Sequence, residues 1–524
     1  MKHSELVSSC SCCPLSRRRF LAAGCAACAG VTGLLATDRL ARAAVAADKP
    51  RIRIIYSLYD KVQPRPTWPH VGYDFRPVMA GIETQLKAAC PGFEFVTSMA
   101  DGSEQAKKIL AQDKSSPVDG YLVMQMNNWP RVVQTVVTSG KPTLFADFTY
   151  GGSGGFLLYT AKMLRQKRPN VGYVASSDPD DLSAAVQCFE IVARGGAMGQ
   201  FVEATERVRR QRTPAPGDLS SLPDPVATLD MKDCLAAMKR GKILAVGGRH
   251  GGLWSAIKKE MGIEVVDVPY AELNAAWQSA DRDQSIEIAE KWQKTARRIE
   301  NVSPETLKQS AAMYLAQKEV LKRHGANAIT INCLGGFYGG HIHAYPCMGF
   351  HELNNEGLIG ACECDLLSTA TMIAMTALTR GRPGFISDPV IDTSTRQIIY
   401  AHCVASNKVF GPEGETSPFE ILTHSEDRRG AAVRSLCPLG YMTTTVKFNP
   451  ARKAIAFHQG KAMANVDDDR ACRTKLAVEP VGDLEKLLRQ WDKWGWHRVT
   501  YYGDLKEPVF TLADALGWKM LEEA

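Results

Sequence analysis

The chain has 524 residues, of which 45% are hydrophobic and 23% are charged, a composition typical of globular proteins. This length is too great for one hydrophobic core and predicts several domains. The formal net charge is +7, but residues 1–46 hold six Lys or Arg against two acidic residues, which leaves only +3 on the remainder. So small a charge gives no support for a nucleic-acid partner.

The N-terminal segment SRRRFLAAGCAACAGVTGLLATDRLARAAVAA has the layout of an export signal. Consecutive arginines precede an uncharged run that continues to Ala36, and small residues such as Ala41 and Ala43 then offer a cleavage site. The pattern resembles the twin-arginine type. We therefore predict a cleaved signal peptide over residues 1–46, recognition by the twin-arginine export machinery, and a periplasmic protein. No later run is apolar for long enough to predict a stable membrane anchor.

Five of the fifteen cysteines lie in this predicted signal. The other ten form no C-x-x-C pair, and several of them lie inside apolar segments. A large domain does not need disulfides for stability, so we expect buried free thiols.

From residue 51 the chain alternates between strand and helix patterns. RIRIIYSLY reads as a buried strand and FRPVMAGIETQLKAAC as an amphipathic helix, and FEFVT, VDGYLVM, PTLFADF and VGYVA continue the strand series. A second series contains the strands ILAVGG, EVVDVPY and NAITINC, with helices expected over 181–213, 285–300 and 304–322. Strands separated by helices predict doubly wound parallel sheets. We expect one α/β domain over 50–168 and a second over 169–379.

After the helix expected over 365–379, the pattern changes to short, alternating segments bounded by turns. These segments are GFISDPV, RQIIYAHCV, FEILTHS, YMTTTVKF, KAIAFHQGKA and KLAVEPV. The chain then closes with a helix, the strand-like HRVTYYGD and a last helix over 508–518. We therefore predict a smaller, β-rich, barrel-like domain over 380–524.

Two glycine-rich segments offer alternative functional sites. GGSGG at 151–155 fits the G-x-S-x-G pattern of a hydrolase nucleophile, which would be Ser153, but four glycines do not hold a serine rigidly. ILAVGGRHGGLW, followed by Asp267, suggests an NADP-dependent sugar oxidoreductase, although its glycines do not fit G-x-G-x-x-G in any register. A close approach of backbones is the structural alternative for both segments.

The third candidate is ACECDLLSTATMIAMTALTRGRPGFISDP at 361–389, which places Glu363 and Asp388 among apolar residues. An unpaired buried carboxylate is costly. A metal ion, a pair of acid/base groups, or helix capping by Glu363 and a turn at Asp388 would each account for them.

These segments resemble the L-fucose isomerase and L-arabinose isomerase-like family. In that family a glutamate at a helix start, an aspartate at the end of the next strand and a C-terminal histidine bind one divalent metal. Glu363 and Asp388 match the first two positions. His497 in HRVTYYGDLKEPVFTLADALGWKM matches the third, with Gly503 and the Thr-Leu-Ala run in the family's layout. The family's order of two α/β domains and a β-rich domain also agrees.

The resemblance implies an aldose–ketose isomerase that works through an enediol. Mn²⁺ or a similar ion would be bound by Glu363, Asp388 and His497, the two carboxylates would act in proton transfer, and a homo-oligomer is expected. The donor set itself suits such an ion. An exported carbohydrate-binding protein without isomerase activity is the alternative from another class.

Several further side chains are weaker candidates. His341 and His343 form an H-x-H pair, and His402 and His424 lie on strands that could face the pocket. Trp494 and Trp496 could stack on a sugar ring or cover the β-rich domain.

Overall fold

The computed structural model describes residues 49–248 and 251–524. The predicted signal over 1–46 lies outside the described residues, as do two residues of the second glycine-rich segment. Within the described part, none of the helices has both the length and the apolar character needed to cross a membrane.

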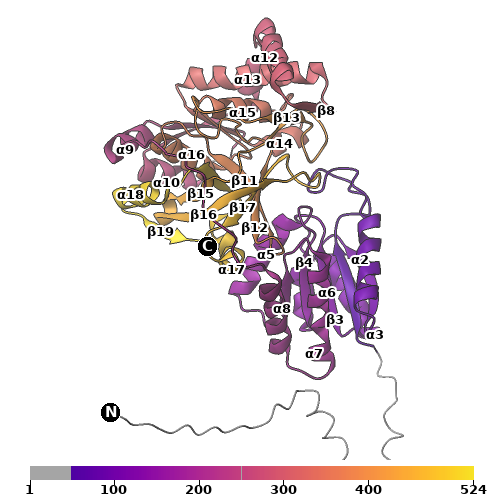
Figure 1. Ribbon diagram of the computed structural model, residues 1–524. Helices are drawn as coiled ribbons and strands as arrows, with labels where there is room; N and C mark the ends of the chain where they lie inside the picture. The colour runs from indigo at the N-terminus through magenta and orange to yellow at the C-terminus, as the bar shows by residue number, and fades with distance from the viewer. Residues whose placement is uncertain (1–48, 249–250) are drawn as a thin grey trace, which may run out of the picture. The chain divides into compact units, whose positions relative to one another are not determined.

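The first sheet is parallel and five-stranded, in the order β2-β1-β3-β4-β5 (Figure 1). Strand β1 is buried over almost its whole length, as expected for a parallel strand covered on both faces. Apolar residues of α2, α6 and α8 pack on one face, and those of α3, α4 and α5 on the other. The strands are β1 (Arg51–Ser57), β2 (Glu94–Ala100), β3 (Gly120–Gln125), β4 (Thr143–Asp147) and β5 (Val171–Val174). The helices are α2 (Arg76–Ala89), α3 (Ser103–Ser115), α4 (Val133–Val136), α5 (Ser153–Arg165), α6 (Pro179–Gln187), α7 (Phe189–Ala193) and α8 (Met198–Arg212).

The second sheet is also parallel, in the order β10-β9-β6-β7. Its longest helix, α13, begins at a Ser303 N-cap followed by Pro304 and ends at Gly325 with φ +57°. The strands are β6 (Lys242–Val246), β7 (Glu264–Val268), β9 (Ala328–Ile331) and β10 (Ile359–Ala361). The helices are α9 (Met231–Lys239), α10 (Gly252–Met261), α11 (Tyr270–Gln278), α12 (Arg282–Thr295), α13 (Pro304–His324), α14 (Cys333–Tyr338), α15 (Cys347–Asn355) and α16 (Leu366–Leu378).

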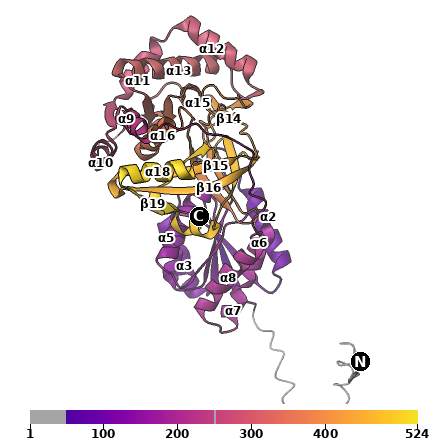
Figure 2. The ribbon, with the colours of Figure 1, turned by 60° about the vertical axis from the view of Figure 1, so that its left-hand side comes forward.

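The C-terminal region forms a closed six-stranded β-barrel, in the order β15-β18-β11-β12-β17-β16, which closes by antiparallel pairing of β15 with β16 (Figure 2). Strand β19 adds to β16 in parallel. The strands are β11 (Phe385–Asp392), β12 (Gln397–His402), β15 (Met442–Asn449), β16 (Ala454–Asn465), β17 (Thr474–Pro480), β18 (Arg498–Tyr502) and β19 (Lys519–Glu522). Two helices, α17 (Leu484–Gln490) and α18 (Lys506–Leu516), complete the region.

These sheets confirm the predicted fold class of two parallel α/β regions followed by a β-rich barrel. Buried apolar residues of the second sheet and of the barrel form one continuous core, and another core joins the first sheet to the barrel. The barrel therefore provides packing surface for both α/β regions.

Three details differ from the sequence-based expectations. Strand β5 lies in the first sheet, which therefore extends past the boundary predicted at residue 168. The helix expected over 181–213 is three helices, and Gly195, with φ +84°, separates α7 from α8. The helix expected over 285–300 ends at Thr295, and β8 (Arg298–Glu300) pairs with β13 (Phe419–Leu422), which also pairs with β14 (Ala432–Ser435).

Candidate metal centre

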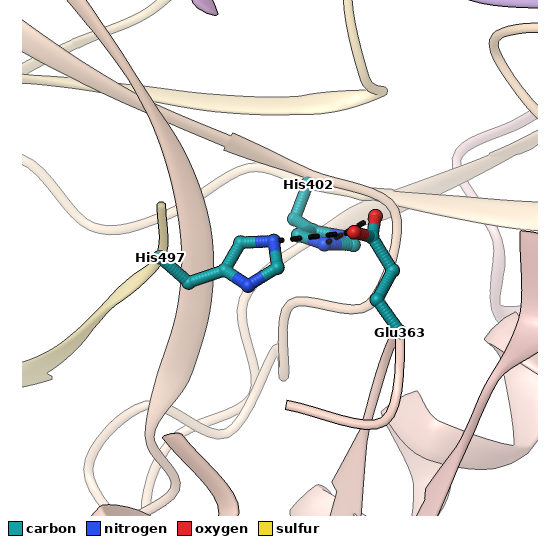
Figure 3. A group of neighbouring side chains, drawn as sticks. All are labelled: Glu363, His402 and His497. Carbon is teal, nitrogen blue, oxygen red and sulfur yellow. Dashed lines mark ion pairs between the residues drawn. The ribbon is translucent and has the colours of Figure 1, made fainter. Parts of the chain in front are cut away.

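Four side chains converge where the barrel meets the second α/β sheet: Glu363, Asp388, His402 and His497. The Nε2 atom of His497 lies 3.0 Å from Asp388 Oδ1 and 3.6 Å from Glu363 Oε2. The Nε2 atom of His402 lies 3.8 Å from Glu363 Oε1. Figure 3 shows both imidazole rings directed at the Glu363 carboxylate. Single donor atoms of Glu363, His402 and His497 all lie within 4.8 Å of one another.

The strand register of the barrel brings three of these residues together. Strand β11 lies between β18 and β12. Asp388 on β11 pairs with Ala401, so His402 is the next residue on the neighbouring strand. On the other side Ser387 pairs with Arg498, and His497 immediately precedes that strand. Residues far apart in the sequence therefore become neighbours at one end of the barrel.

Glu363 comes from the second α/β sheet. It lies in the connection that follows β10 and precedes α16, at the carboxyl end of a parallel strand, where α/β sheets commonly bind ligands. Both Glu363 and Cys364 have positive φ values, +60° and +52°. Such a backbone is unfavourable for residues other than glycine and clusters at functional sites. The turn directs the Glu363 carboxylate towards the barrel histidines.

The burial of the four side chains separates them into two kinds. The side chains of Asp388, His402 and His497 are 4–6% exposed, whereas that of Glu363 is 30% exposed. Solvent therefore reaches the cluster at Glu363.

The donor atoms fit a divalent cation. Among the described residues, Asp388 Oδ1 and the Nε2 atoms of His402 and His497 have no hydrogen-bond partner of acceptable geometry, although all three are buried. Buried polar atoms without partners are rare in native proteins and call for an ion or another ligand. Two carboxylates and two imidazoles are suitable ligands for Mn²⁺ and similar divalent ions.

Electrostatic interactions in the cluster are strong. Burial lowers the pKa of His497, but its contacts with the carboxylates of Asp365 and Asp388 outweigh burial and raise that pKa to about 10. Burial raises the pKa of Glu363 well above its usual range, and the nearby Asp388 carboxylate adds to the effect. Burial lowers the pKa of His402. The carboxylates of Asp365 and Asp388 thus favour positive charge at His497.

The structure brings together all three residues predicted as metal ligands, Glu363, Asp388 and His497; their roles stay predictions. Two local expectations were wrong. Glu363 precedes α16 and does not cap it, because Asp365 is the N-cap. Asp388 lies within β11, which continues to Asp392.

The sequence alone predicts His402 only on a strand that could face the pocket, and it does not single out Asp365 or Lys447. Asp365 has a signal in the sequence, since Asp-Leu-Leu-Ser is a helix N-cap pattern. Lys447 is a charge within the alternating strand segment TTTVKF, and only the register of the barrel reveals its contact with Asp365.

The first alternative site is explained by packing. Ser153 is buried, and its hydroxyl donates to Asp147 Oδ2 at 2.5 Å. A Cβ atom on Gly155 would lie 1.6 Å from the carbonyl oxygen of Asn128. Similarly, a Cβ atom on Gly152 would lie 1.7 Å from the carbonyl oxygen of Gln125. The glycines of GGSGG therefore permit close backbone contact with neighbouring segments.

The first two glycines of the second glycine-rich segment, Gly247 and Gly248, also pack closely. Gly247 has φ +63°, and a Cβ atom there would lie 2.1 Å from the Tyr270 ring. The rings of His341 and Tyr270 stack with centroids 5.4 Å apart, and His343 contacts Trp277. These histidines pack against aromatic side chains.

The remaining weak candidates also have structural partners. His424 Nδ1 lies 3.1 Å from Asp427 Oδ1. Trp496 packs edge-on against Trp129 and lies over Gly154. The ten described cysteines are free, and nine of them are buried, as expected.

Comparison with known proteins identifies distant relatives. The sulfoquinovose isomerase of Clostridium sp. (strain MSTE9) is 24% identical over 292 residues, which cover 52% of this chain and 63% of the relative. That of Alkalicoccus urumqiensis is 26% identical over 121 residues, or 23% and 26% of the two chains. That of Priestia aryabhattai is 21% identical over 220 residues, or 41% and 48%. The chain thus spans less than two thirds of the length of each of these relatives.

A scan against models of known protein families finds no match. Among solved structures, the XylFII molecule is 13% identical and matches 60% of this chain and 96% of its own, with a TM-score of 0.16. A solute-binding protein from Bacillus halodurans C-125 with bound myo-inositol is 14% identical, at 56% and 82% coverage and the same TM-score. TM-scores of 0.16 do not establish a shared fold. The sequence comparison shows that distant curated homologues of this chain are sulfoquinovose isomerases.

Proposed function

We propose that this protein is a metal-dependent aldose–ketose isomerase, similar in its metal centre to the L-fucose and L-arabinose isomerase-like family. One observation carries the proposal: Glu363, Asp388, His402 and His497 converge from two parts of the fold, and three of their buried donor atoms lack a hydrogen-bond partner among the described residues. The sulfoquinovose isomerase relatives support the reaction class.

The proposed cofactor is Mn²⁺ or a similar divalent ion. Glu363, Asp388 and His497 would hold it, and His402 is an additional donor. When bound, such an ion polarises the carbonyl and the adjacent hydroxyl oxygen of an open-chain sugar, which makes the C2 proton more acidic.

The protein's own residues then have to move protons. Conversion of an aldose to a ketose moves one hydrogen from C2 to C1 and one from the O2 hydroxyl to O1. Glu363 is the most exposed member of the cluster, so we assign its carboxylate to the transfer between C2 and C1. We assign the buried Asp388 to the transfer between the two oxygens. Together these steps pass through an enediol and leave the sugar's composition unchanged.

We also propose that the protein acts outside the cytoplasm and forms a homo-oligomer. The arginine-containing N-terminal segment supports export. Support for the oligomer comes from the family resemblance alone. An isomerase in the periplasm would act on sugars before their uptake.

The test is a substrate panel. The mature protein is incubated with Mn²⁺ and with aldoses that include sulfoquinovose, pentoses, hexoses and deoxyhexoses, and ketose formation is measured by chromatography. The expected result is turnover of at least one aldose, abolished by Glu363→Gln and by a metal chelator. Binding of a sugar without turnover, equally strong in Glu363→Gln, would instead support a carbohydrate-binding protein.

A further inference from the structure

A buried lysine lies behind the candidate metal centre. The Lys447 side chain on β15 is only 2% exposed. Its Nζ donates to Asp365 Oδ2 at 2.7 Å and to the Ser368 hydroxyl at 2.6 Å. Burying an ammonium group is costly unless it is paired and hydrogen-bonded, and both conditions are met here. Asp365 is therefore its principal partner.

Asp365 connects three parts of the fold. Its Oδ1 accepts from the backbone N–H of Ser368, which caps α16. Its Oδ2 accepts from Lys447 on β15 and lies 3.0 Å from Nδ1 of His497, the residue before β18. The helix cap and the lysine thus hold the Asp365 carboxylate in place against His497.

The contact with Asp365 determines which nitrogen of the His497 ring carries the proton. An ionised carboxylate only accepts hydrogen bonds, so Nδ1 of His497 has to be the donor. A metal binds only the neutral imidazole, and in that form the other nitrogen, Nε2, then carries the lone pair. That atom points at Glu363 and Asp388, at 3.6 and 3.0 Å. A carboxylate behind a histidine in this way also makes the ring a better metal ligand.

We propose that Asp365 and Lys447 are positioning residues that hold His497 in the tautomer and orientation required for binding a divalent metal. Lys447 acts on Asp365, and Asp365 acts on His497. This inference rests on the proposed metal centre and extends it to residues outside the four converging side chains.

The test measures Mn²⁺ binding to metal-stripped protein by calorimetry, independently of turnover. Asp365→Asn is the informative variant, because the amide oxygen can still cap α16 while the negative charge is lost. Its Mn²⁺ affinity is expected to fall about 10–100-fold, the usual effect of losing such an outer partner. The matched control is Asp230→Asn, which alters another helix-capping aspartate, on α9, and should leave the affinity unchanged.

A double-variant cycle tests the order of action. Lys447→Met should lower the affinity in the wild-type background but add no further loss to Asp365→Asn, since its effect passes through that carboxylate. A purely structural role predicts lower thermal stability with unchanged Mn²⁺ affinity, which would overturn the inference. It would also be overturned if the wild-type protein bound no Mn²⁺. If the wild type binds Mn²⁺ but isomerises no sugar, only the proposed reaction fails, and the variants still decide the positioning role.

Discussion

At the level of single residues, the proposed metal centre depends most on the contact between Asp388 and His497. Their facing atoms lie 3.0 Å apart in a buried environment. Asp388→Asn removes one proposed anionic ligand, and the Mn²⁺ affinity is expected to fall at least about tenfold, measured by calorimetry. Asp392→Asn is the matched control, because Asp392 is buried in the same strand but bonds to Ser177 and Ser394. Equal affinity of both variants would contradict the role of Asp388.

The sequence predicted the convergence of Glu363, Asp388 and His497 because two separated segments match one family layout. It could not predict Asp365 and Lys447 in the same way. Asp365 reads as an ordinary helix cap, and Lys447 reads as one charge in a strand of unknown direction. Their contact depends on the pairing of β15 with β18 and on the packing of α16 against β15, which are long-range features.

At the scale of elements, the start of α5 depends on close backbone contact. Gly155→Ala would place a Cβ atom 1.6 Å from the Asn128 carbonyl oxygen. The backbone has to shift, so we expect a loss of about 1–3 kcal/mol in the free energy of unfolding, measured by urea denaturation. Gly199→Ala on α8 is the control, since a Cβ there contacts nothing and alanine favours a helix. A Gly155→Ala variant as stable as the wild type would instead support a flexible, catalytic loop at Ser153.

Periodicity predicted most elements, including α13 with its Ser303 cap and the six barrel strands. It failed where a tertiary contact decides the outcome. The helical pattern over 285–300 ends early because Arg298–Glu300 forms a strand with β13, more than one hundred residues later in the chain. Similarly, the sequence predicts a β-rich, barrel-like region after residue 379, but it does not predict the order of the strands around the barrel.

At the scale of the whole molecule, a buried charge cluster links the C-terminus to the barrel. The Arg498 guanidinium donates two hydrogen bonds to the Glu523 carboxylate, at 2.7 and 3.0 Å. The Nδ1 atom of His458 lies 3.3 Å from Glu523 Oε2. Burial raises the pKa of Glu523, but the guanidinium of Arg498 and the hydrogen bond with His458 outweigh it and lower the pKa from 4.5 to about 2.

This depressed pKa predicts how stability depends on pH. The ionised Glu523 contributes roughly 3 kcal/mol to folding above pH 4.5, and this contribution is lost as the pH falls towards 2. The difference in unfolding free energy between wild type and Glu523→Gln should therefore be large at pH 6 and should shrink between pH 4.5 and 2. Exposed Glu507→Gln is the control, with no such difference. A difference that is independent of pH would contradict the ionised cluster.

In the proposed reaction, Glu363 and its neighbours carry out enediol chemistry on a sugar. The most direct test follows the C2 proton by NMR while the mature protein is incubated with Mn²⁺ and the aldose panel in D₂O. The account predicts that deuterium enters C1 or C2 of at least one sugar and that Glu363→Gln abolishes this exchange. If protein shown to bind one metal ion per chain exchanges no proton of any sugar, the isomerase assignment is wrong.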